Sequence, residues 1–141
     1  MAEAKNTKRR PRPRRRSRAR SLAVEISFLE GLVRRDPEYV EAWEVLGDDY
    51  IETGRMGDGL KVDERLCQLL PRDSRARYNL ACSLASTGQL DAAVSELDLA
   101  LDLGFRDFPH LAKDPELDPL RKHPHFHKIR AKIRALKTAK F

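Results

Sequence analysis

Four carboxylates of this chain are the residues best placed to do chemistry. They recur three, four and four residues apart, which places them along one face of a predicted helix: Glu41, Glu44, Asp48 and Glu52. Like charges at this spacing destabilise a helix by roughly 0.2–0.5 kcal/mol per pair, so the stripe does not serve helix stability. It is compatible with a solvated helix face and with a face that binds a ligand, and the pattern alone leaves both interpretations open.

Patterns for catalysis or metal binding are missing from the sequence. There is no glycine-rich phosphate loop, and no nucleophile stands beside a base at a recognisable spacing. His123, His125 and His127 alternate, and a spacing of two does not bring side chains together on a helix. Structural zinc usually takes four ligands, and no cysteine or acidic residue accompanies these histidines. We therefore expect neither an enzyme nor a bound metal or other cofactor.

The acidic stripe lies inside a segment that repeats. Pro37 and Pro71 are 34 residues apart, and so are Gly54 and Gly88, which suit the turns inside two helical hairpins. One hairpin cannot bury its own apolar face, so neighbouring hairpins are expected to stack. The pattern predicts helices over about 37–53, 57–70, 74–87 and 90–103.

The first copy resembles the tetratricopeptide repeat family. The segment from Trp43 to Tyr50 fits the signature W-x-x-L-G-x-x-Y. The second copy has Arg77 at the tryptophan position, and in the first copy Gly59 takes the small position while Asp63 replaces an aromatic residue. The second copy keeps the family's small and apolar positions at Leu80, Ala81, Leu84, Ala93, Leu97 and Ala100.

Further helices are predicted on both sides of the two repeats. Apolar residues at helical spacing predict one helix over 21–35 and another that begins at Pro124. The run from Leu111 to Phe126 resembles a degenerate closing repeat, D-x-x-L-D-x-L-R-x-x-P-x-F, and its Asp-Pro pairs predict short capped helical turns. We predict an all-α helical-hairpin repeat solenoid with N- and C-terminal capping helices. Its parts are a disordered basic tail (1–20) and a helical domain (21–141), with repeats at about 37–70 and 71–104 and a closing repeat or cap at 105–141.

The family resemblance implies a protein that holds a peptide or a partner surface against its concave face. Some members of the family grip the C-terminus of chaperones with basic residues and asparagine. Asn79 fits that clamp, but Glu44 and Asp48 stand where it needs Lys and Asn, so we expect repulsion of that ligand and binding of a basic or neutral peptide. The groove positions that the resemblance implies are Glu41, Glu44, Asp48, Glu52, Arg75, Tyr78, Asn79 and Cys82.

Charge is strongly segregated along the chain. The net charge is +6, yet residues 21–120 carry 21 acidic and 10 basic residues, and residues 121–141 carry eight basic residues and no acid. The first twenty residues hold ten Lys/Arg against Glu3, without interleaved aromatic residues that could stack on bases. They suit sequence-independent nucleic-acid binding, a solubilising or localisation tail, or docking onto the chain's own acidic stripe. The candidate nucleic-acid residues are Arg9, Arg10, Arg12, Arg14, Arg15, Arg16, Arg18 and Arg20.

The remaining expectations concern compartment and assembly. Cys67 and Cys82 form no C-x-x-C pair, which indicates free thiols in a reducing compartment. No apolar run is long enough to cross a membrane, so we expect a cytoplasmic protein, or a nuclear one in a eukaryote. The last predicted helix is basic and amphipathic, which suits a capping helix or one that lies on a membrane or a partner. The ends of the stack leave a homodimer open.

Overall fold

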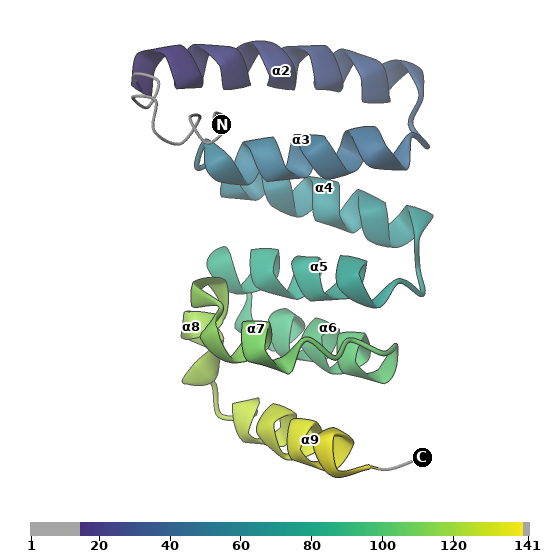
Figure 1. The fold of residues 1–141 in the computed structure, drawn as a ribbon, viewed down its shortest axis with the longest axis vertical. Coiled ribbons are helices and arrows are strands. Elements are labelled where there is room, and N and C mark those ends of the chain that lie inside the picture. Colours follow the sequence, from purple (N-terminus) through teal and green to yellow (C-terminus); the bar gives the residue numbers. More distant parts are fainter. Residues whose placement is uncertain (1–14, 140–141) are drawn as a thin grey trace, which may run out of the picture.

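The computed structural model describes residues 15–139, and in this range the chain is helical without any strand. The helices stack in chain order from α2 at one end to α9 at the other (Figure 1). This confirms the predicted all-α architecture of packed helical hairpins. The elements are α2 (Arg15–Arg35), α3 (Val40–Glu52), α4 (Met56–Leu69), α5 (Ser74–Ser86), α6 (Leu90–Asp102), α7 (Phe108–Lys113), the 3-10 helix η1 (Pro115–Leu117), α8 (Asp118–Arg121) and α9 (Phe126–Thr138).

The pairs α3–α4 and α5–α6 are the two predicted hairpins. Gly54 and Gly88 have φ angles of +81° and +83°, a left-handed conformation that glycine adopts without strain. The first hairpin begins at Val40, three residues later than predicted, because Pro37 lies in a turn whose carbonyl accepts a hydrogen bond from Trp43 Nε1 at 2.8 Å. The tryptophan of the signature thus fixes the entry into the hairpin.

Two apolar clusters hold the stack together. One joins α2, α3 and α4. The other joins α5 and α6 to α9 and to residues 105–125, which we call the closing segment. At Gly47 an added Cβ would lie 3.0 Å from Val62 Cγ1, so a small residue is needed where α3 meets α4. In the second cluster the ring of Tyr78 stacks on Phe105, with centroids 4.2 Å apart. The repeats are therefore packed from end to end.

Helix α2 covers the outer face of the first hairpin and is longer than predicted. It begins at Arg15, whereas the sequence predicted a tail through residue 20. Arginine is a good helix former, and Arg18 forms an ion pair with Glu52 at the end of α3, so this turn has a partner. Further along, Tyr50 Oη donates to Glu30 at 2.5 Å. The other predicted tail residues, 1–14, lie outside the described residues.

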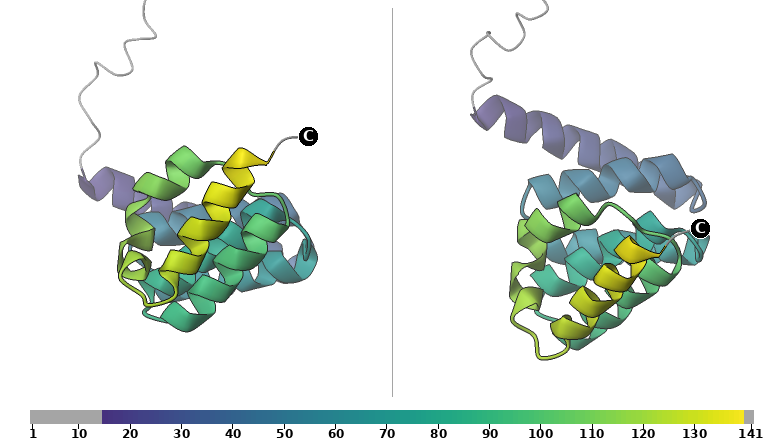
Figure 2. Two further views of the ribbon diagram at one scale, coloured as in Figure 1. Left: turned by 90° about the horizontal axis from the view of Figure 1, so that it is seen from below. Right: turned by 60° about the horizontal axis from the view of Figure 1, so that its bottom comes forward.

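The closing segment covers the last hairpin. Asp107 accepts a hydrogen bond from the His110 backbone N–H and Asp114 accepts one from Glu116, so both predicted short turns are capped by aspartate. Figure 2 shows α9 lying along α6. In α9, Phe126 and Ile129 are buried, and the packing of α9 on α6 is that of a capping helix. None of the described helices is long and apolar enough to cross a membrane.

One buried carboxyl group between α2 and α3 lowers the stability of the fold at neutral pH. Asp49 is 6% exposed, and its Oδ2 is buried without a hydrogen-bond partner. Burial raises the pKa of Asp49 to about 6, the nearby carboxyl of Glu25 raises it further, and Arg18 lowers it. Folding raises this pKa, so protonation of Asp49 favours the folded state. This contribution to the free energy of unfolding is fully present below pH 3.8, the usual pKa, and is lost as the pH rises through about 6.

Replacing Asp49 with asparagine should therefore stabilise the protein at neutral and alkaline pH. We expect Asp49→Asn to raise the free energy of unfolding by roughly 1–3 kcal/mol at pH 8, and to change it little at pH 4. Urea unfolding at both pH values measures the difference. Glu41→Gln, an exposed change on the same helix, is the control and should stay within about 0.5 kcal/mol. An equal effect of Asp49→Asn at both pH values would contradict this explanation.

Candidate functional site

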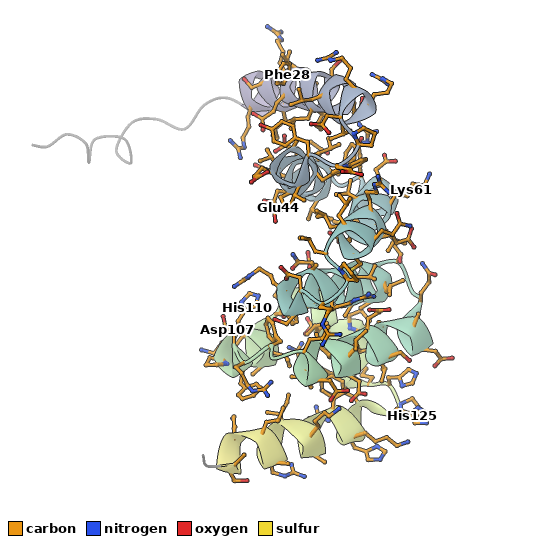
Figure 3. The ribbon with its side chains drawn as sticks, turned by 90° about the vertical axis from the view of Figure 1, so that its right-hand side faces the viewer. Phe28, Glu44, Lys61, Asp107, His110 and His125 are labelled. Atoms are coloured by element: carbon orange, nitrogen blue, oxygen red, sulfur yellow. The ribbon has the colours of Figure 1, made fainter. Side chains whose placement is uncertain are left out.

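A groove of about 680 Å³ runs between α3, α4 and α5. Glu44, which lines it, lies on the same side of the molecule as His110 and Asp107, while Lys61 of α4 lies on the opposite side (Figure 3). The groove therefore lies on the side of the stack that carries Asp107 and His110. Its lining residues are Glu44, Gly47, Asp48, Ile51, Glu52, Asp63, Leu66, Leu70, Asp73, Arg75, Ala76, Asn79, Ser83 and Glu116.

Five of the eight expected groove residues line this groove. They come from the first helices of the two hairpins, which both pack against α4: Glu44, Asp48 and Glu52 of α3, and Arg75 and Asn79 of α5. Glu41 is exposed on α3 but lies beyond the lining residues. The carboxylate stripe thus contributes three of its four members to the groove.

Tyr78 and Cys82 lie in the core instead of in the groove. Each is 3% exposed. Their face of α5 is covered by the closing segment, where Tyr78 Oη donates to Asp114 Oδ2 at 2.6 Å and the Cys82 thiol donates to the same oxygen at 3.6 Å. Their assignment to the groove is corrected because the closing segment covers this face of α5. Both side chains instead hold the closing segment in place.

The groove also contains acidic residues that the sequence analysis did not assign to it. Asp63 was noted only as a replacement for an aromatic residue, and that polar substitution inside a helical pattern was the one signal that pointed to it. Asp73 also caps α5 by accepting from the Ala76 N–H at 2.9 Å. Glu116 comes from η1, and no spacing in the sequence relates it to the repeats.

Six carboxylates and one cation give the groove a strongly negative charge. Asp63 lies deepest, and Ser83 Oγ donates to it at 2.5 Å. Burial raises the pKa of Asp63 to about 6 despite this hydrogen bond, and Glu116 and Asp48 raise it further. Burial also raises the pKa of Asp48 and of Glu116. A cation in the groove would relieve this repulsion, because opposite charges nearby favour the ionised carboxylate.

A second cluster lies beneath the groove, where ligand atoms of Cys82, Asp114 and Glu116 come within 4.8 Å of one another. Both oxygens of Asp114 are already engaged, one by Tyr78 and Cys82 and the other by the backbone of η1. Burial raises the pKa of the Cys82 thiol, which keeps the thiol protonated. Metal ligation requires a thiolate, so this arrangement favours a hydrogen-bonded support for the closing segment.

The candidate nucleic-acid residues fall mostly at the edge of the structure or beyond it. Arg18 pairs with Glu52, and Arg20 is exposed on α2. Arg15 and Arg16 belong to the first turn of α2. Outside the described residues lie Arg9, Arg10, Arg12 and Arg14.

Comparisons with known proteins give partial relatives. The chain is 30% identical over 91 residues, 63% of its length, to the peroxisomal targeting signal receptor of Komagataella phaffii. It is 36% identical over 64 residues (45% of its length) to superkiller protein 3 of Saccharomyces cerevisiae, and 42% identical over 53 residues (38%) to a chloroplastic protein of Arabidopsis thaliana.

These matches support the repeat architecture without assigning a family. The chain spans only 16%, 4% and 16% of the lengths of these three relatives, respectively. The receptor and superkiller protein 3 contain tetratricopeptide repeats, which agrees with the helical hairpins seen in this chain. No protein-family model matches the sequence.

The buried thiols give a direct check on the corrected placement of Cys82. Burial raises the pKa of the Cys67 thiol to about 11 and raises that of Cys82 as well. We expect a disulfide reagent at pH 8 to modify both cysteines at least about 100-fold more slowly in the native protein than in guanidinium. Absorbance of the released thiol reports the rates. Immediate reaction of the remaining thiol in a native Cys67→Ser variant would show that Cys82 is open to the groove.

Proposed function

We propose that this chain is a protein-interaction module whose groove binds an extended, cationic segment of a partner protein. The observation that carries this proposal is the groove itself, in which six carboxylates and a single arginine surround about 680 Å³. A ligand with Lys or Arg side chains is the natural complement of such a surface, since complementary charge sets both the encounter rate and the choice of partner.

The floor of the groove supports a peptide rather than a free cation. Ile51, Leu66 and Leu70 line it between the carboxylates and offer apolar contact to the stems of long basic side chains. Asn79 supplies an amide that can both donate to and accept from an extended backbone. A volume near 680 Å³ lies within the range of small binding sites, about 300–1,000 Å³.

The comparisons support a binding role in general terms. One relative is by name a receptor for a targeting signal, and its match covers 63% of this chain. The chemistry of the ligand is inferred from the charge of the groove in this chain. Glu44 and Asp48 make the groove-lining face of α3 acidic, so the complementary ligand is a basic segment.

A second candidate function is binding to nucleic-acid phosphates. In α9 the side chains of Lys128, Arg130 and Arg134 are exposed, and no acidic residue follows Asp118 in the chain. The apolar side of α9 is occupied by its packing on α6, so this face offers charge without an apolar surface for membrane insertion. A steep loss of affinity with added salt is the signature of this function.

Reversing charge in the groove tests the peptide proposal. The probe is a fluorescein-labelled peptide of four Arg-Ala repeats, whose fluorescence anisotropy reports binding. We expect Glu44→Lys with Asp48→Lys to weaken its affinity at least about 10-fold by replacing attraction with repulsion. The matched control, Glu38→Lys with Glu64→Lys, makes the same charge change at exposed positions outside the groove lining. An equal loss in both double variants would show that only net charge matters.

The pH dependence of binding tests the role of Asp63. A bound cation favours ionised Asp63, whose pKa of about 6 lies well above its usual value. Binding of the probe should therefore weaken about 3–10-fold as the pH falls from 7.5 to 5 and this carboxylate takes up a proton. Asp63→Asn should bind more weakly at pH 7.5 and flatten the profile. An unchanged pH dependence in this variant would remove Asp63 from the binding site.

A further inference from the structure

We propose that residues 5–14 of this same chain occupy the acidic groove when no partner is bound, so that a partner must displace them. This inference rests on the proposed function, since it assigns a competitor to the same site. Its support lies in where α2 begins, in the charge of the residues that precede it, and in the distance that they must cover.

The start of α2 lies at the most acidic end of the groove. Arg18 forms an ion pair with Glu52, which is itself a lining residue. In Figure 1 the N-terminus of α2 and the C-termini of α3 and α5 all lie on the left side of the stack, where α8 and the adjoining η1 also lie. Residues 5–14 therefore adjoin a helix start whose Arg18 already contacts Glu52, a carboxylate of the groove.

The charge of residues 5–14 complements the groove. This stretch contains six cations and no acid, and Glu3 is the only acidic residue before it. Pro11 and Pro13 favour extended backbone, the conformation that a groove between helices can hold. Leu and other aliphatic residues are absent from the stretch, so the attraction is electrostatic. The six cations are Lys5, Lys8, Arg9, Arg10, Arg12 and Arg14.

The segment is long enough to extend along the whole groove. Along α3, the groove extends from Glu52 to Glu44, about 12 Å at the rise of an α-helix. The ten residues of the segment reach about 33 Å when extended. This is more than twice the length of the groove along α3, so residues near Arg14 can turn back from α2 while the earlier ones pass Glu52, Asp48 and Glu44.

Tethering makes even weak docking effective. Covalent attachment to α2 gives the segment an effective concentration at the groove of about 1 mM. If the untethered segment binds with a dissociation constant near 100 μM, the groove is about 90% occupied. A competing partner then binds about 10-fold more weakly than it would to an open groove. The exposed ion pair of Arg18 adds little stability by itself. Its role in this proposal is to hold the start of α2 close to Glu52.

The first test compares two full-length variants that lose the same charge. In the neutral-tail variant all six cations of residues 5–14 become glutamine, and in the control six cations elsewhere do so: Lys113, Lys122, Lys128, Arg134, Lys137 and Lys140. We expect the neutral-tail variant to bind the Arg-Ala probe about 10-fold more tightly than wild type at low salt. The control should gain much less. Equal gains in the two variants would overturn the proposal.

The same titrations separate this inference from the proposed function. If the groove binds the probe but the tail does not compete, wild type and neutral-tail variant bind it equally, and Glu44→Lys with Asp48→Lys weakens both. If the groove does not bind cationic peptides at all, reversal of Glu44 and Asp48 leaves probe binding unchanged in both backgrounds.

A spin label at Ala4→Cys locates the segment directly. The label is selective because Cys67 and Cys82 are buried. We expect broadening of the amide signals of Asn79 and Ser83, and none at Lys61 on the opposite side (Figure 3). Reversal of Glu44 and Asp48 should abolish the broadening. Broadening that appears when labelled protein is mixed with isotope-enriched, unlabelled copies would show that a second molecule supplies the segment and would contradict docking within one chain.

Discussion

A helical hairpin has an apolar face that it cannot cover by itself, and the whole arrangement of this chain follows from how that face is covered. Leu97 and Leu101 of α6 are fully buried in a cluster that includes residues of α9 and of the closing segment. At the other end, Ile26 and Leu29 of α2 cover the face of α3. Stacking brings the first helices of both hairpins onto one side of the molecule, and the groove between them is the consequence.

The carboxylates of the groove lower the stability of the fold, and packing does not account for their presence there. Asp63 occupies a position where the tetratricopeptide repeats that this sequence resembles carry an aromatic residue, and it is partly buried near Asp48 and Glu116. A hydrophobic residue there would add to the core, whereas this carboxylate is ionised at neutral pH against the preference of its surroundings. Sites that oppose local stability are those where function is expected. The cost falls when a cation enters, so binding and stability are linked through the same carboxylates.

The repeat pattern was enough to predict α3–α6, because turns and small residues at fixed spacing determine a helical hairpin locally. The same pattern grouped Glu44, Asp48, Glu52, Arg75 and Asn79, and these five residues line one groove. It failed at Tyr78 and Cys82, whose burial depends on a closing segment that follows no repeat. It missed Glu116 for the same reason, because contacts between segments unrelated by a period leave no spacing to detect. In the first turns of α2, Arg18 contacts Glu52, a partner 34 residues away that no local pattern indicates.

Helix α3 connects the groove to the N-terminal end of the fold. Asp48 lines the groove, while Asp49, the next residue, is buried against α2 beside Glu25. The charge of Asp48 raises the pKa of Asp49, and Arg18 of α2 lowers it. A cation that neutralises Asp48 therefore makes ionised Asp49 less unfavourable and strengthens the docking of α2 at neutral pH. A cation in the groove therefore strengthens the packing of α2, the helix that follows the basic segment. This coupling needs no movement of α3 itself.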